Sequence, residues 1–168
     1  RGAKVMYVHA PDLPMVDVRV VLDAGSARDG DLPWMAKFPN AMLSEGAGDW
    51  DADVLALRLE DRGIELGNGS LRDMAWVSLR SLIEPEVLDV ALGTAQAVLA
   101  KPRFDAEAIE RVRQQMQIGL RRSLQSPASV AKRRFFQTLY ADHPYAHPPA
   151  GNESSLAAIR RGDLERFH

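Results

Sequence analysis

The stretch 32–51, LPWMAKFPNAMLSEGAGDWD, constrains the fold most, because it carries signals for both ends of one helix. Pro33 stands where the helix would begin, and a proline in a first turn costs no helical hydrogen bond. Gly46 and Gly48 follow the last periodic residue, where glycines commonly end a helix. We therefore predict a helix from Pro33 to these glycines. Pro39 lies deep inside it and is expected to bend or interrupt it, since its ring removes a backbone donor.

The segments around this stretch predict an antiparallel sheet. Residues 15–24 alternate valine and leucine with charged residues, which is typical of a half-buried strand. Residues 3–9 are rich in valine and tyrosine and predict another strand, and residues 64–70 and 73–82 predict an antiparallel pair. In the last strand, Ala75, Val77 and Leu79 form the predicted apolar face.

Capping residues predict the remaining helices. Asp51 or Asp49 would cap a helix over 52–62 that Gly63 ends, and Pro85 would open one over 86–100. The other expected helices are a long one from the Asp105 cap to about Leu124, one over 128–140 after Ser126-Pro127, a short one over 156–160 capped from 152–155, and one capped by Asp163. In the 128–140 helix, the core candidates are Phe135, Phe136, Leu139 and Tyr140. Strands and helices in this order predict an α+β domain, a mostly antiparallel sheet with helices packed on it.

One short motif resembles a known family. Residues 42–46, Met-Leu-Ser-Glu-Gly, are similar to the Met-Leu-x-x-Gly that follows the H-x-x-E-H motif of the pitrilysin/insulinase family of zinc peptidases. The resemblance puts residues 37–41 at the position of that motif. Lys37 and Ala41 then replace the two histidine ligands, and Asn40 replaces the general-base glutamate.

A second helix carries the rest of the resemblance. Residues 110–114, Glu-Arg-Val-Arg-Gln, are similar to a Glu-Arg-Glu-Arg-Gln run of active relatives. The resemblance places the family's third zinc ligand at Gly119 and a helper glutamate at Val112. Residues 24–26 and 142–148 resemble the family's Ala-Gly-Ser and Asp-His-Pro-Tyr-x-x-Pro segments, so the similarity covers nearly the whole chain. It implies a single domain over 1–168, an incomplete N-terminal domain of the mitochondrial-processing-peptidase type, because family members continue into a further strand and helix.

The substituted residues are incompatible with the family's chemistry. Catalytic zinc takes three protein ligands, while a protonated lysine, an alanine and a glycine supply none. Asparagine cannot serve as a general base near neutral pH. We therefore expect no catalytic, metal or cofactor-binding residue, and no cofactor. For Gly119 the alternative interpretation is purely structural, a small residue that lets another element pack close.

The resemblance implies a role and partners. Family chains form clam-like chambers, and in two-subunit types one subunit holds zinc while its partner shapes the chamber and holds substrate. We expect this chain to be the non-catalytic half, with a zinc-bearing sister subunit or domain and a peptide substrate as partners. Residues 64–70 correspond to an edge strand that substrate peptides extend, although Gly67 and Gly69 also fit a bulge or a loose edge. The alternatives are a structural scaffold subunit, or a domain of a longer peptidase chain whose zinc site lies elsewhere.

Composition excludes some other functions. A net charge of −2 argues against a dedicated nucleic-acid binder, and the chain has no cysteine for disulfides or thiolate metal sites. No apolar run is long enough to span a membrane. If the chain is bacterial, the resemblance favours the periplasm over the cytoplasm. His143 and His147 have the i, i+4 spacing that would suit a metal on a helix, but Pro144 and Pro148 favour a structural loop there. The basic patch at 121–122 and 132–134 is expected to be a solvated face rather than a phosphate site, and His9 a surface residue. Trp34, Trp50 and Trp76 are expected to be core residues or interface anchors.

Overall fold

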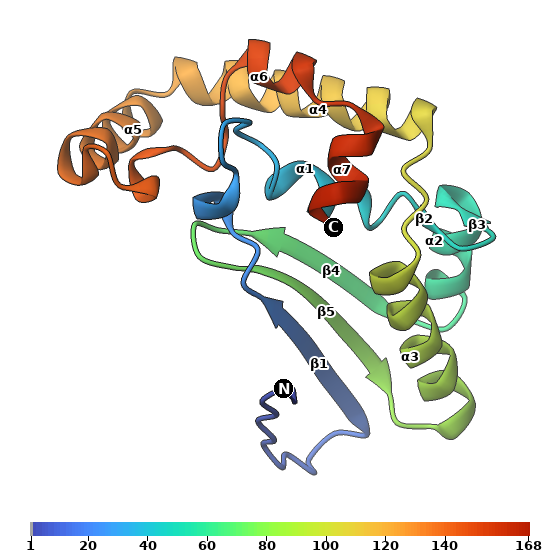
Figure 1. The fold of residues 1–168 in the computed structure, drawn as a ribbon. Helices are drawn as coiled ribbons and strands as arrows, with labels where there is room; N and C mark the ends of the chain where they lie inside the picture. The colour runs from blue at the N-terminus through green and yellow to red at the C-terminus, as the bar shows by residue number, and fades with distance from the viewer. Residues whose placement is uncertain (1) are drawn as a thin grey trace.

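A computed structural model describes residues 2–168 and shows a small antiparallel sheet with helices packed on it (Figure 1). The sheet has the strand order β1-β5-β4, and both strand pairs are antiparallel. β1 spans Met15–Leu22, β4 spans Glu65–Ser70 and β5 spans Ala75–Leu82. The expected α+β class and the antiparallel pair β4–β5 are confirmed.

The alternation of β5 explains the buried face of the sheet. Ala75, Val77 and Leu79 are all buried, as the period-2 pattern predicts. In register, Val18 of β1 and Leu66 of β4 lie on either side of Leu79. The C-terminal end of β1 is less buried than its middle, and its last three residues, Val20–Leu22, are exposed.

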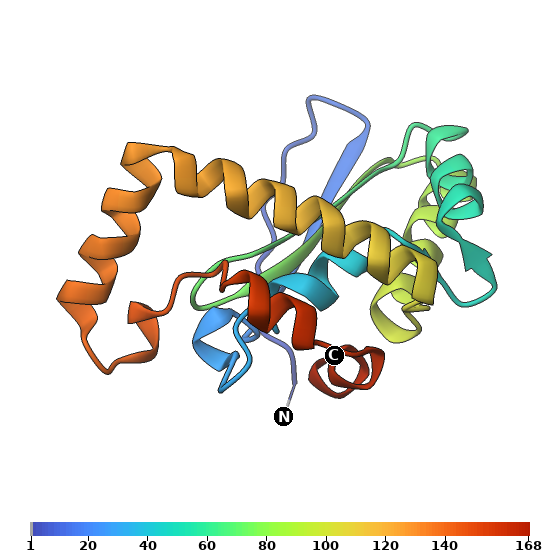
Figure 2. The ribbon, with the colours of Figure 1, turned by 90° about the horizontal axis from the view of Figure 1, so that it is seen from above.

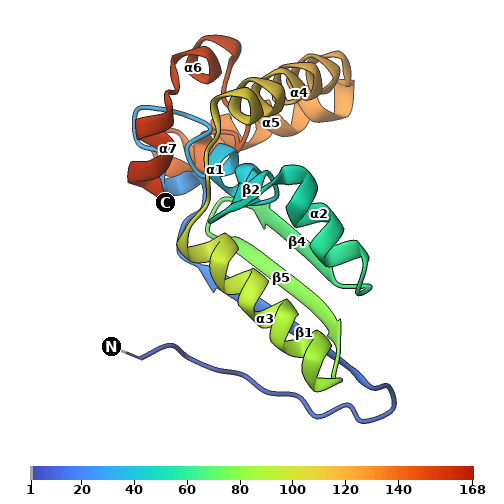
Figure 3. The ribbon, with the colours of Figure 1, turned by 90° about the vertical axis from the view of Figure 1, so that its right-hand side faces the viewer.

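The predicted strand over 3–9 is wrong. The segment forms no strand, and Val5–Val8 are almost fully exposed. Figure 3 shows this segment running away from the sheet. A strand exists only through hydrogen bonds to a neighbour, and β1 is paired with β5 alone.

The helix expected from Pro33 is much shorter, because α1 spans only Lys37–Met42. Trp34 has a positive φ of 89°, so the chain turns before the helix begins. The Asp29 carboxylate accepts hydrogen bonds from the backbone amides of Trp34 (3.0 Å) and Ala36 (2.7 Å) in this turn. Pro39 is the third residue of α1, where a backbone N–H has no helical acceptor. The proline therefore lies in the first turn of a helix that begins late, and α1 continues without interruption to Met42.

Longer helices flank the sheet and α1. The helix α2 (Ala52–Glu60) begins at its predicted cap, with the amide of Val54 donating to Asp51 Oδ1 at 2.9 Å. It follows the short hairpin of β2 (Gly46–Ala47) and β3 (Trp50–Asp51). The helix α3 (Pro85–Ala100) begins at its proline, and α4 (Ala106–Gln125) passes over α1 on one side of the sheet (Figure 2). Asp105 precedes α4 as predicted, but its carboxylate accepts from Arg103 Nε at 2.6 Å and makes no capping bond.

The C-terminal third differs from the prediction in detail. A short 3-10 turn, η2, lies at Pro144–Ala146, and the other such turn, η1 (Ser26–Arg28), follows β1 near the start of the chain. The helix α6 (Glu153–Ala158) begins three residues earlier than expected, with Asn152 as its cap. In α7 (Arg161–Phe167), Asp163 is the third residue and accepts from the Arg160 amide at 2.9 Å, so it stabilises the start from inside the helix.

The helix α5 (Pro127–Tyr140) begins at the predicted Ser126 cap but contains no buried residue. Phe135 is 60% exposed and Leu139 is 58% exposed, so their assignment to the core is wrong. Figure 2 shows why, since α5 extends beyond the sheet at the far end of α4. Phe136 and Tyr140 are half-buried and stack on each other, with ring centroids 5.8 Å apart.

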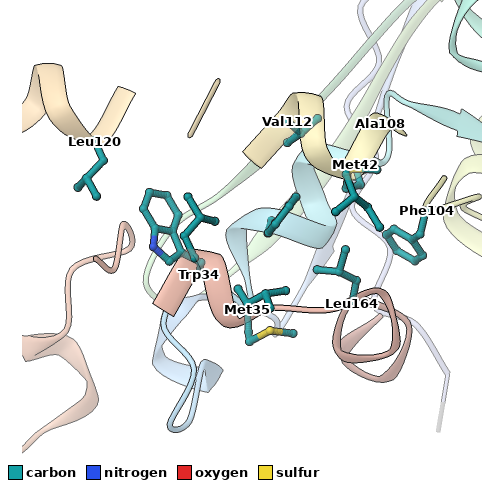
Figure 4. Packing of buried hydrophobic residues seen from close by; sticks show 12 residues of the cluster. Trp34, Met35, Met42, Phe104, Ala108, Val112, Leu120 and Leu164 are labelled. Atoms are coloured by element: carbon teal, nitrogen blue, oxygen red, sulfur yellow. The ribbon is translucent and has the colours of Figure 1, made fainter. Parts of the chain in front are cut away.

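The main core lies between α1, α4, α6 and α7. Figure 4 shows side chains of this core from α1, α4 and α7, among them Met42, Val112 and Leu164. The buried members are Trp34, Met35, Phe38, Met42, Phe104, Ala108, Ile109, Val112, Leu120, Leu156, Ile159 and Leu164. This cluster holds α1 between α4 and the C-terminal helices, so it fixes the two helices that carry the candidate site.

Candidate functional site

A cavity of about 370 Å³ lies between α1 and α4. Lys37 and Ala41 reach it from α1, and Val112 and Gly119 reach it from α4. Four of the five positions named from the family resemblance therefore line one cavity, although they lie on helices far apart in the sequence. The full lining is Trp34, Lys37, Ala41, Val112, Gln115, Met116, Gly119, Leu120, Ser123 and Ala150.

The fifth position, Asn40, does not line this cavity. Its side chain is directed to the sheet, where Nδ2 donates to the backbone oxygen of Trp76 in β5 at 3.3 Å. The residue is only 8% exposed. It lines a separate cavity of about 300 Å³ together with Val20, Pro39 and His168. The residue at the general-base position thus serves to join α1 to the sheet.

Gly119 leaves open space in the middle of α4. A Cβ added at this residue would meet no heavy atom within 4 Å outside the backbone of its own helix. The suggestion that a small residue lets another element pack close is therefore wrong. Val112, one of the buried residues of the main core, closes another part of the cavity. The missing side chains at Ala41 and Gly119 thus leave room in the cavity.

The donor atoms of this cavity do not fit a zinc ion. Zinc in proteins is bound by imidazole, thiolate or carboxylate, and the lining contains none of them. The available polar groups are an ammonium, an amide, a hydroxyl, a thioether and an indole. Over residues 2–168, no group of three or more His, Cys, Asp or Glu side chains is placed to hold a metal.

Lys37 dominates the electrostatics of the cavity. It is the sole charged residue of the lining, and its Nζ lies 5.6 Å from the centroid of the Trp34 ring. Among the ion pairs of residues 2–168, none involves Lys37. The indole N–H of Trp34 is not free to bind a ligand, because Nε1 donates to the backbone oxygen of Asn152 at 3.0 Å. The cavity therefore presents one uncompensated positive charge beside an aromatic face.

Asp29 is a buried carboxyl close to the start of α1 that no sequence pattern pointed to. Burial raises its pKa to about 6, although the amides of Ala36 and Trp34 and the nearby His147 act to lower the pKa. The amides of Trp34 and Ala36 lie in the turn directly before α1, so their hydrogen bonds to the Asp29 carboxylate hold the backbone that leads into Lys37. Its role could not be read from the sequence, because its two amide partners lie in an irregular turn.

The strand β4 borders α1 and forms one edge of the sheet. Its six residues pair with β5 in unbroken register from Glu65–Arg80 to Ser70–Ala75, so the bulge considered for this strand is absent. A Cβ at Gly69 would lie 2.2 Å from the Trp76 ring. The glycine is therefore needed because the half-buried Trp76 crosses over it.

The other candidate residues have structural surroundings. His143 and His147 flank the 3-10 turn η2 rather than share a helix face, and the amide of Tyr145 donates to His143 Nδ1 at 3.2 Å. In the basic patch, Arg121 pairs with Glu153 at 2.7 Å and Arg133 donates to the backbone oxygen of Gly151 at 3.2 Å. In the part of the chain described, every helix is too short or too polar to cross a membrane.

Comparisons with known proteins find similarity to peptidase-like proteins that are described as inactive. No model of a known protein family matches the chain. The non-peptidase homolog YmxG of Helicobacter pylori is 28% identical over 163 residues, which are 96% of this chain and 37% of that protein. The crystal structure of a peptidase M16 inactive domain from Pseudomonas fluorescens is 38% identical, with a TM-score of 0.92 over 95% of this chain and 39% of that one.

A more distant structure shares the fold. The periplasmic protease PqqL from Escherichia coli is 16% identical, with a TM-score of 0.86 over 96% of this chain and 18% of that protein. The chain thus spans less than two fifths of the relatives named here. The two more similar relatives are described as a non-peptidase and an inactive domain, which agrees with the substituted positions in the α1–α4 cavity.

Proposed function

We propose that this chain, an inactive peptidase-like domain similar to the M16 inactive domain, is the non-catalytic half of a two-part zinc metallopeptidase. In this role it shapes the chamber and holds substrate, while a zinc-bearing sister subunit or domain cleaves the peptide. The proposal assigns no chemical step to the chain itself.

One observation carries the proposal. The positions that the family resemblance assigns to ligands and helper converge on one cavity, yet they carry Lys37, Ala41, Val112 and Gly119. The helices α1 and α4 and the edge strand β4 around them are all retained. A chain that keeps this architecture but lacks the reactive groups is expected to be used for its surface.

The edge of β4 is the proposed peptide-holding element. Its order in the sheet leaves one side of the strand for an added strand, and its register with β5 is regular. Main-chain hydrogen bonds to an edge bind extended peptides with little dependence on sequence. Asn68 anchors the strand, because its Nδ2 donates to Ser44 Oγ at 2.8 Å just beyond α1.

The proposal includes the expectation that the α1–α4 cavity binds no zinc. Metal analysis of protein purified in the presence of zinc should give far less than one equivalent per chain. One tightly held equivalent, lost on substitution of residues around this cavity, would overturn the expectation and with it the assignment as the non-catalytic half.

The main experiment is reconstitution with a zinc-bearing sister. We expect the sister alone to cleave its peptide slowly and to gain activity when the full-length form of this chain is co-expressed, with both proteins eluting together. A fully active sister that elutes separately would exclude the proposed role. The structural scaffold would then be the better interpretation.

A further inference from the structure

We propose that the cavity between α1 and α4 binds a carboxylate of the held peptide, with Lys37 as the charged partner. This inference rests on the proposed function, since it names the chemistry that the peptide must offer. The location at which active relatives hold a cation would thus hold an anion in this chain.

The first step concerns charge. The Lys37 ammonium is the sole charged group of the lining, and no carboxylate of residues 2–168 forms an ion pair with it. The ring of Trp34 at 5.6 Å favours the cation at this location but does not neutralise it. Lys37 is exposed to solvent, so the cavity offers one accessible and unpaired positive charge to an anion.

The second step concerns shape and lining. Ala41 and Gly119 leave space beside the lysine, and Gln115 and Ser123 contribute an amide and a hydroxyl that can donate to an oxygen. The remaining surface is apolar, from Val112, Met116 and Leu120 among others. A volume of about 370 Å³ lies in the range of small-ligand sites. This lining suits a carboxylate attached to an aliphatic stem.

The third step separates a carboxylate from a phosphate. Phosphate sites gather several arginines, lysines or backbone N–H groups, whereas this cavity has one lysine. No residue of the basic patch at 121–122 and 132–134 lines this cavity, and two of them are already bonded, since Arg121 pairs with Glu153 and Arg133 donates to a backbone oxygen. The single charge matches a peptide C-terminus or an acidic side chain.

Three fluorescent peptides of otherwise identical apolar sequence test the inference by anisotropy at low salt. One is neutral with a C-terminal amide, one has a free C-terminal carboxylate, and one has the amide and a single internal glutamate. We expect at least one acidic peptide to bind about tenfold more tightly than the neutral peptide, as a charge-assisted hydrogen bond supplies. If the peptide with the free C-terminus binds more tightly, the carboxylate is a peptide C-terminus. If the glutamate peptide binds more tightly, it is an acidic side chain.

Variants assign the preference to the cavity. Lys37→Gln should reduce the acidic preference to less than twofold, while the matched control Lys101→Gln, at the end of α3, should keep it. Gly119→Leu should weaken both acidic peptides by filling the cavity. Equal affinity for all three peptides, or a preference that survives in Lys37→Gln, would overturn the inference and leave the proposed function intact. If no peptide binds at all, the proposed peptide-holding role fails as well.

Discussion

At the scale of single residues, Gly119 is a test of whether the cavity is open space. A glycine inside a helix costs about 1 kcal/mol relative to alanine, and a Cβ here meets nothing. Gly119→Ala should therefore raise the free energy of unfolding by roughly 0.5–1 kcal/mol in urea denaturation. Gly93→Ala in α3 has equally open surroundings and should behave alike.

Gly69→Ala provides the opposite case, because its new Cβ would lie 2.2 Å from the Trp76 ring. We expect a loss of stability in this variant, measured in the same way. Destabilisation by Gly119→Ala with a gain from Gly93→Ala would mean that another group occupies the space beside α4.

Asp29 predicts a pH dependence whose sign follows from burial. Its pKa is raised to about 6 in the folded protein, against about 3.9 for an unfolded aspartate. Between these values the folded state binds a proton that the unfolded state lacks, so this group adds stability as pH falls from 7 toward 4. The free energy of unfolding of wild type relative to that of Asp29→Asn should therefore increase as the pH falls from 7 to 4, and it should not change with pH above about 7.

Asp23→Asn is the control for that measurement. The pKa of Asp23 is lowered, first by the hydrogen bond from Arg28, and the residue is exposed. Its contribution is lost only below the unfolded pKa, so the difference between wild type and this variant should stay flat from pH 7 to 4.5. An equally flat Asp29→Asn difference would contradict the raised pKa.

At the scale of elements, Arg113 joins α4 to the C-terminal helices. It is 7% exposed, and Nη1 and Nη2 donate to the backbone oxygens of Leu156 and Ile159, the latter at 2.9 Å. These carbonyls end α6, where helical acceptors have no partner. The guanidinium therefore satisfies two buried acceptors from a neighbouring helix.

Arg113→Lys should destabilise the protein by about 1–3 kcal/mol, because lysine has a single nitrogen in place of the forked Nη1 and Nη2 that reach the two carbonyls separately. Arg111→Lys is the matched control on the same helix, where a side chain that is 49% exposed pairs with Glu45. Such a pair contributes less than about 1 kcal/mol. Thermal or urea unfolding of both variants provides the comparison, and equal losses would mean that the inter-helix bonds of Arg113 contribute little.

The elements also show what a sequence can predict here. Caps and prolines located the starts of α2, α3 and α5, because these signals are local. The late start of α1 depends on Asp29, five and seven residues before the amides it binds, and the exposure of α5 depends on its position beyond the sheet. The family resemblance predicted that four positions share one site, and they line one cavity, namely Lys37, Ala41, Val112 and Gly119. The resemblance could not predict that Asn40 is directed to the sheet, because this depends on its hydrogen bond to the Trp76 carbonyl.

At the scale of the whole molecule, the sheet has two edges with different chemistry. β4 lies beside α1 and carries the glycine crossed by Trp76. β1 forms the other edge, and its last three residues are exposed valine and leucine. An exposed apolar edge strand readily pairs with another strand, and two copies related by a two-fold axis can pair β1 with β1.

We therefore expect this 168-residue chain to self-associate through β1 at high protein concentration. Val21 is 54% exposed on this edge, and a lysine there should oppose strand pairing because charged side chains protect natural edges. Val21→Lys should sediment as a monomer at concentrations at which the wild type forms dimers. Val54→Lys, at an exposed position of α2, adds the same charge outside β1 and should still dimerise. If Val21→Lys associates as the wild type does, pairing does not use β1, and β4 becomes the edge to test by blocking it with an extended peptide.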